Sequence, residues 1–313
     1  MSDEATDKLW PHFAPLWKDL QRIAPDLLLV GGYGLFLKQQ WLLSQLSFLG
    51  PETGDTTATQ REEELVVNEV RTVVPIERWK NQTPRVTKDF DILASLDVIA
   101  SSEQQRQFHD ALIEHGFVFK IKLWQFEKKI GEDQSVILEF HAPSPKEKRD
   151  DLRLEGKRVK PKPSLGEFGI HGRENAEAAG SEFHPFSFIH SGVEILLPNP
   201  VTLTLMKLIA TRERHQRSEN ASSLAENRPK ERRQAQKHAE DVCRVVAMMT
   251  LEERDSADFI LASVRDTQVF KDAQSTFSEY FQTNESWGSQ AVIDKWENND
   301  FDVIRETLAA WYG

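Results

Sequence analysis

The chain has 313 residues and a formal net charge of −11, with 39% hydrophobic and 28% charged residues. These values are typical of a globular protein with one or two domains, and the negative charge argues against broad electrostatic binding to nucleic acid. The single cysteine, Cys243, excludes a disulfide framework and a multi-cysteine metal site. No apolar run approaches the roughly 20 residues that cross a membrane. The first residues are acidic and lack signal-peptide character, so we expect a cytoplasmic protein with no membrane association.

The first part of the chain predicts a small mixed sheet with flanking helices. Apolar residues recur at helical spacing over 9–23 and 102–116, and a short apolar run at 27–30 predicts a buried strand that leads into a helix over 33–46. Residues 142–185 are polar and rich in Pro and Gly, and we expect them to be mostly loop. The other strands are expected at 88–94, 117–122, 123–129, 136–140 and 193–197.

From Pro200 onward the pattern is helical. Between the first two helices, residues 216–229 are polar and predict an exposed loop. The sequence therefore predicts an α+β fold, in which a mixed sheet flanked by helices in residues 1–199 is followed by a helical C-terminal domain in residues 200–313. The helices of that domain are expected at 201–214, 232–249, 251–264, 271–281 and 301–311.

Two carboxylates, Asp89 and Asp91, lie two residues apart in a strand that begins near Arg85. Side chains alternate across a strand, so both carboxylates should share one face, while Phe90 and Ile92 point into the core. Two anions so close repel each other unless a cation lies between them, and a hard dication such as Mg²⁺ prefers oxygen ligands. The alternative interpretation is an ordinary charge pair at the end of a strand.

Two further motifs accompany the acidic strand. Gly31-Gly32-Tyr33 stands between the strand at 27–30 and a helix, where glycines let backbone N–H groups approach a phosphate at the helix N-terminus. Glu139 is embedded in a later apolar strand, and His141 should share its face, although we expect a plain strand-end histidine there. Together the motifs indicate metal-assisted phosphoryl or nucleotidyl transfer.

In this order the motifs resemble those of the polymerase-beta-type nucleotidyltransferase superfamily, and within it the AbiEii-like proteins, whose members include toxins of type IV toxin–antitoxin systems. The resemblance covers roughly residues 25–245. The residues and segments that carry it are Gly31, Gly32, Arg85, Thr87, Asp89, Asp91, Glu139, 197–200, 203–210 and 237–241.

The resemblance implies transfer of a nucleotidyl group from a nucleoside triphosphate (NTP) to an acceptor. Asp89, Asp91 and Glu139 would be catalytic and would hold two Mg²⁺ ions. The acceptor would be tRNA, and the protein would be a toxin or phage-defence component paired with an antitoxin. The residues implied to bind the nucleotide are Gly31, Gly32, Tyr33, Arg85, Thr87 and Lys207, and the implied supporting residues are Lys237 and Asp241.

The chain departs from the family pattern at two points. About fifty residues separate Gly34 from Arg85, where family members commonly have few. We therefore expect an insertion at about 48–84, in which the polar, Gly- and Thr-rich residues 50–63 form a mobile loop. The Lys-Asp pair usual at the start of the later helix is here Lys237-His238, although Asp241 remains.

Several alternatives stay open at this stage. Lys207 lies among apolar residues and is either a snorkelling lysine or a triphosphate contact. The basic segments 146–162 and 212–237 are either solvated faces or edges that hold a polyanion, and the second interpretation favours tRNA. The rival functions are a nucleotidyltransferase for a small molecule of the aminoglycoside type, and an inactive nucleotidyltransferase fold that serves as a binding subunit.

Overall fold

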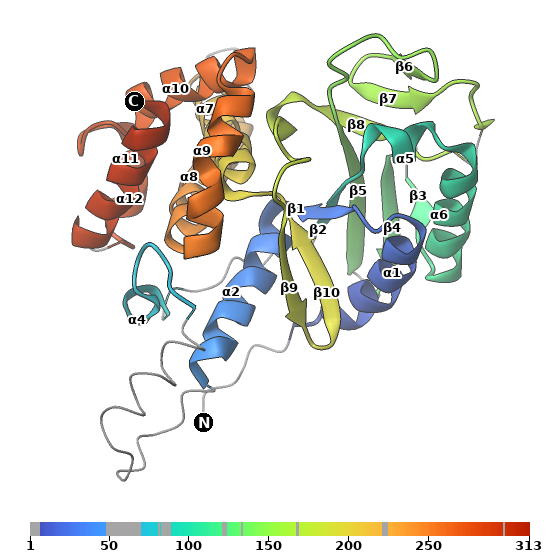
Figure 1. The fold of residues 1–313 in the computed structure, drawn as a ribbon, viewed down its shortest axis with the longest axis horizontal. Helices are drawn as coiled ribbons and strands as arrows, with labels where there is room; N and C mark the ends of the chain where they lie inside the picture. The colour runs from blue at the N-terminus through green and yellow to red at the C-terminus, as the bar shows by residue number, and fades with distance from the viewer. Residues whose placement is uncertain are drawn as a thin grey trace. The chain divides into compact units, whose positions relative to one another are not determined.

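The computed structural model describes most of the chain and divides it into two compact units (Figure 1). The sheet unit comprises the described residues within 1–34 and 85–198, and the helical unit those within 35–84 and 199–313. The described residues are 7–47, 70–80, 82, 89–120, 124–132, 134–166, 169–220, 225–296 and 298–313. The predicted α+β class is confirmed, because a mixed sheet flanked by helices is followed by a helical C-terminal region.

An eight-stranded mixed sheet forms the centre of the sheet unit. Parallel strands β2 and β5 are its middle, and β1 runs antiparallel to β2 at one side. Strand β5 also pairs with β4 through its first half and with β8 through its last residues. The strands are β1 (Leu28–Val30), β2 (Asp89–Leu93), β3 (Val118–Phe119), β4 (Gln125–Lys129), β5 (Ser135–Pro143), β6 (Leu152–Leu154), β7 (Arg158–Pro161) and β8 (Gly172–Asn175).

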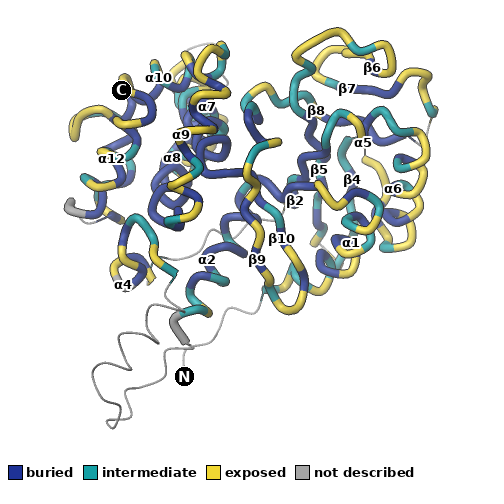
Figure 2. The backbone as a smooth tube through the Cα atoms, in the orientation of Figure 1, coloured by how far each residue is buried: buried dark blue, intermediate teal, exposed yellow. Residues whose placement is uncertain are grey.

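The central strands have one apolar and one polar face. Phe90 and Ile92 of β2 and Phe140 of β5 are completely buried, as the period-two alternation predicts. Figure 2 shows the buried parts of the chain in dark blue. Helix α1 (Trp10–Ile23) covers this face through Phe13, whose ring centroid lies 4.6 Å from that of Phe90. Helix α6 (Ser102–Glu114) covers it through Phe108, 6.0 Å from Phe140. The polar side chains therefore gather on the opposite face.

Three further elements complete the sheet unit. Helix α2 (Gly31–Ser47) begins directly after β1, and the short helix α5 (Leu96–Ala100) follows β2. The hairpin of β9 (Phe186–His190) and β10 (Val193–Leu197) packs beside β1. It is tied to α1 by a hydrogen bond of 2.9 Å from the Trp17 indole to the Glu194 carbonyl. These contacts hold the hairpin against β1 and α1.

Most of the described residues within 142–185 lie outside helices and strands, as predicted, but the segment also contains short strands that the sequence analysis did not predict. Strands β6, β7 and β8 and a 3-10 turn at Ala176–Ala178 lie within this segment. Each strand is only three or four residues long, which is too short to show periodicity, and the strands carry polar residues where they meet solvent. Pairing with neighbouring strands, which a local pattern does not reveal, makes them extended.

The helical unit contains the longest helices of the described chain. Helices α7 and α8 form an extensively packed pair. Helix α7 continues past its predicted end at 214, and α11 has only seven residues and was not predicted. The helices are α4 (Ile76–Trp79), α7 (Pro200–Glu219), α8 (Arg228–Ala247), α9 (Leu251–Val264), α10 (Gln268–Tyr280), α11 (Trp287–Ile293) and α12 (Asn298–Tyr312), with a 3-10 turn at Ala225–Asn227.

The described residues within 35–84, which the sequence analysis placed in the first domain, belong to the helical unit. Polar contacts hold them there. Lys38 of α2 forms a buried ion pair with Glu253, the Val73 amide donates to the Met249 carbonyl at 3.1 Å, and Arg78 pairs with Asp300 at 2.8 Å. The predicted loop at 50–63 lies outside the described residues.

Replacing Lys38 by methionine should lower the free energy of unfolding by about 3–5 kcal/mol, because Glu253 would keep its charge in the interior without its cation. The two side chains are 3% and 4% exposed, and the Nζ–Oε1 distance is 2.6 Å. Urea unfolding checks this. Arg22→Met is the matched control, because Arg22 pairs with Asp19 at the surface and should lose less than about 1 kcal/mol. Equal losses would contradict the prediction.

Candidate metal centre

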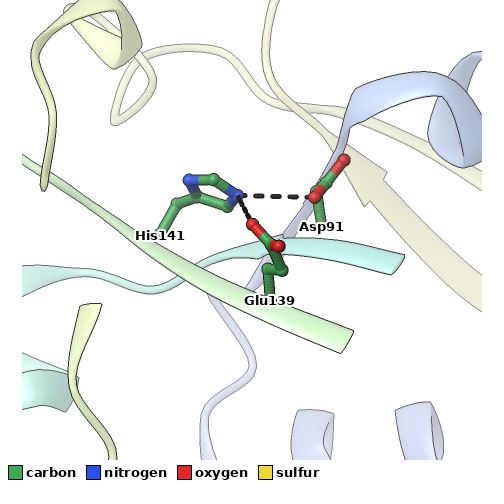
Figure 3. Close-up of side chains that lie close together, drawn as sticks. All are labelled: Asp91, Glu139 and His141. Carbon is green, nitrogen blue, oxygen red and sulfur yellow. Dashed lines mark hydrogen bonds and ion pairs between the residues drawn. The ribbon is translucent and has the colours of Figure 1, made fainter. Parts of the chain in front are cut away.

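Three side chains converge on the polar face of β2 and β5 (Figure 3). The parallel register places Asp91 opposite Glu139, and His141 follows Glu139 on the same face of β5. The His141 Nε2 atom lies 3.4 Å from Asp91 Oδ1 and 3.9 Å from Glu139 Oε2. One ligand atom from each residue lies within 4.8 Å of the others.

The donor set fits one divalent metal ion. Ligand atoms at about 2.0–2.6 Å from a cation lie about 3–5 Å from each other, which matches the separations in this cluster. Two carboxylates and one imidazole also satisfy the charge and donor preferences of such an ion. Among the described residues, this is the group of acidic and histidine side chains close enough to share a metal.

The pKa of Glu139 reflects both its burial and its repulsion by Asp91. Burial, and after it the charge of Asp91, raise the pKa of Glu139 above its ordinary value, while His141, Gln125 and Arg173 act in the opposite direction. Gln125 of β4 donates a hydrogen bond of 2.6 Å to Glu139 Oε1 and fixes the carboxylate. A cation between the two carboxylates would relieve their repulsion.

The glycine turn packs directly against this cluster. Gly31 has φ +78°, and a Cβ atom there would lie 2.1 Å from Asp91 Oδ2. Only glycine fits, because a side chain would be strained by the backbone and would collide with the carboxylate. The glycine turn and the acidic strand therefore meet in the structure, and the positive end of α2 lies beside the Asp91 carboxylate.

Asp89 is placed differently from Asp91. It is exposed at the start of β2, opposite Ile137, and it is not one of the three clustered residues. His141 takes the third place instead: it follows Glu139 by two residues on the same face of β5, and its Nε2 atom lies 3.4 Å from Asp91 Oδ1. Its two-residue spacing from Glu139 was the available signal, but a strand-end histidine was preferred in the sequence analysis. The metal role of Asp89 stays a prediction.

Of the other residues predicted to bind the nucleotide, the structure describes Tyr33 but not Arg85 or Thr87. The Tyr33 side chain is buried in the apolar core, with its ring 4.9 Å from Phe90, and its hydroxyl donates to Asp7 at 2.6 Å. Only the backbone at this position remains a candidate for phosphate binding. Arg85 and Thr87 lie outside the described residues.

Lys207 and Asp241 come together in the helical unit. The Lys207 Nζ atom lies 2.9 Å from Asp241 Oδ2, and the side chains are 6% and 0% exposed. Asp241 also accepts a hydrogen bond of 3.3 Å from Arg244. These contacts join α7 to α8, while Lys237, one turn before Asp241, is exposed. A structural role explains the buried pair, and the predicted nucleotide role of Lys207 stays a prediction.

Ion pairs neutralise much of the two basic segments. Glu155 lies 3.2 Å from Arg158 and 2.5 Å from Lys160, and Arg149 pairs with Asp97 and Asp151 at 2.7 Å. In the second segment, Arg214 and Arg217 have glutamate partners. Lys230, Arg233 and Lys237 are exposed on α8, and the structure shows no ion pair for them among the described residues.

The chain has no significant match among protein-family models, curated proteins or solved structures. The nucleotidyltransferase resemblance therefore depends on the sequence motifs themselves. None of the described helices combines the length and the apolar character that crossing a membrane requires.

Proposed function

We propose that this protein is a metal-dependent nucleotidyltransferase. The observation that supports this most is the packing of Gly31 against the carboxylate of Asp91, which stands opposite Glu139 on the adjacent parallel strand. A helix N-terminus and a metal-binding carboxylate pair at one place can together hold the charge of a triphosphate. The alternative interpretation, an ordinary charge pair at the end of a strand, gives no reason for Gly31 to pack against the Asp91 carboxylate.

Each residue has a role in this proposal. Asp91 and Glu139 would bind the metal ion, which supplies neutralisation of phosphate charge and activation of the acceptor hydroxyl. Gln125 holds Glu139 in one orientation, and the backbone from Gly31 offers amide donors to the phosphates. Either carboxylate can accept the proton of the acceptor hydroxyl. Positioning and charge neutralisation would contribute most of the rate enhancement.

Arg173 of β8 adds a cation to the same face. Its guanidinium lies 3.8 Å from Glu139 Oε2 and over the Trp124 ring, 5.6 Å from the ring centroid. Stacking on the indole limits the movement of the side chain, which is half-exposed. A planar guanidinium with several N–H donors suits a phosphate, so we assign Arg173 to substrate binding.

The direct test is to incubate the purified protein with each labelled NTP, a divalent metal salt and total tRNA. Label transfer to RNA that requires the metal supports the proposal. Label transfer to an aminoglycoside-type compound instead would support the small-molecule alternative. Absence of transfer to any acceptor, together with retained nucleotide binding, would support an inactive binding subunit. The toxin role and the antitoxin partner depend on the family resemblance alone.

If tRNA is the acceptor, the exposed cations of α8 should contribute to its binding. Replacing Lys230, Arg233 and Lys237 by serine should weaken RNA binding and reduce the log–log salt slope by about one per lost phosphate contact. The matched control replaces Arg153 and Arg158, which already lie near Glu155, and should change the slope less. Filter binding at several salt concentrations measures the slope for each variant. The prediction would be contradicted if both variants changed the slope equally, or if RNA binding did not depend on salt concentration.

A further inference from the structure

We infer that His141 is a metal ligand and makes this centre selective for a first-row transition-metal dication, for which Mn²⁺ is the probe, over Mg²⁺. This inference rests on the metal site of the proposed function and goes beyond it by naming the third ligand and the class of ion. The motifs alone implied an all-carboxylate site for Mg²⁺ with Asp89 as the third ligand, whereas the structure brings His141 to Asp91 and Glu139.

The distances favour a ligand over an ordinary histidine–carboxylate bond. Charge-assisted N–H···O bonds are about 2.7–2.9 Å long, and the bond between His115 and Asp19 in the same unit is 2.7 Å. In contrast, His141 Nε2 is 3.4 Å from one carboxylate oxygen and 3.9 Å from the other. Both separations are longer than the usual range for such bonds, and they suit atoms that share one cation at about 2.0–2.2 Å.

The burial and direction of His141 support the same conclusion. The residue is 8% exposed, and Nε2 points between Asp91 and Glu139 (Figure 3). Its other ring nitrogen, Nδ1, is buried and has no hydrogen-bond partner among the described residues. Nε2 is therefore the ring nitrogen that faces polar side chains. A buried imidazole with a nitrogen directed at two carboxylates is a ligand arrangement common to transition metals.

The nature of the donors determines the selectivity. Mg²⁺ prefers oxygen ligands and keeps much of its water, whereas Mn²⁺, Fe²⁺ and Zn²⁺ accept an imidazole beside carboxylates. Gln125 orients Glu139, and Gly31 packs against Asp91, so both carboxylates are held in place for the ion. A site with two oxygens and one nitrogen should therefore bind Mn²⁺ more tightly than Mg²⁺.

The experiment uses the full chain without nucleotide. Mn²⁺ binding is followed by electron paramagnetic resonance, and Mg²⁺ is added as a competitor. The wild type should prefer Mn²⁺ by at least about tenfold, and pulsed measurements should show coupling of Mn²⁺ to a nitrogen nucleus. His141→Asp replaces nitrogen by oxygen, so it should lose the nitrogen coupling and reduce the Mn²⁺/Mg²⁺ preference about tenfold or more. His115→Asp is the matched control and should change neither.

Unchanged selectivity and unchanged nitrogen coupling in His141→Asp would overturn the inference, as would a wild type that binds no Mn²⁺. His141→Gln provides the same readout if His141→Asp does not fold. The outcome is separable from the proposed function: nitrogen-coupled Mn²⁺ binding without nucleotidyl transfer supports the inference and refutes the enzyme. Nucleotidyl transfer by a His141→Asp variant that retains wild-type metal preference refutes the inference and supports the enzyme.

Discussion

Replacing Asp91 by asparagine should reduce nucleotidyl transfer by about 100- to 1,000-fold, the usual effect of removing a group that neutralises developing charge. The change removes a metal-facing oxygen charge and keeps the size of the side chain. Because Asp91 lies beside Glu139 without a cation between them, the apo protein should keep or gain stability. Steady-state label transfer and thermal unfolding of the same preparation measure the two effects.

The matched change is Asp89→Asn, two residues earlier on the same strand. Asp89 is exposed and is not part of the three-residue cluster, so this variant should lose much less activity than Asp91→Asn. An equal loss would show that Asp89 holds a second ion, as the family resemblance implies. Wild-type activity in Asp91→Asn would remove Asp91 from the metal site and with it the proposed mechanism.

The comparison of sequence with structure shows which part of a site a local pattern can predict. Alternation in 88–94 correctly predicted that Phe90 and Ile92 are buried. It could not predict that Asp91 stands opposite Glu139, because strand register is set by packing between distant segments. For the same reason it could not choose between Asp89 and His141 as the third member of the cluster.

The same limit applies to the prediction of the fold: contacts between distant segments cannot be predicted from a local pattern. Long amphipathic segments such as 251–264 were predicted with the bounds that α9 has in the structure. The short strands β6 to β8 are extended because they pair with neighbouring strands, so a local pattern did not predict them. In the same way, the described residues within 35–84 belong to the helical unit because of contacts such as that of Lys38 with Glu253. Local propensity does not contain this information.

Replacing Gly31 by alanine should lower the free energy of unfolding by more than about 3 kcal/mol and weaken Mn²⁺ binding by about 100-fold. Two costs combine. A positive φ of +78° is unfavourable for alanine by about 1–2 kcal/mol, and the new Cβ would lie 2.1 Å from Asp91 Oδ2. Because β1 and β2 are paired at this point, Asp91 can move away only by leaving its place in the metal centre.

Gly192→Ala separates the two costs, because Gly192 has a similar φ of +74° and a Cβ there would meet no atom within 4 Å. It should lose only about 1–2 kcal/mol and keep full Mn²⁺ affinity. In the double variant Gly31→Ala with Asp91→Ala, the colliding carboxylate is absent, so the two changes should be non-additive in stability. Urea unfolding and Mn²⁺ titration of five proteins complete the comparison: the wild type, the single variants Gly31→Ala, Gly192→Ala and Asp91→Ala, and the double variant. If Gly31→Ala behaved like Gly192→Ala in both measurements, the glycine turn would have no role in holding Asp91 at the metal centre.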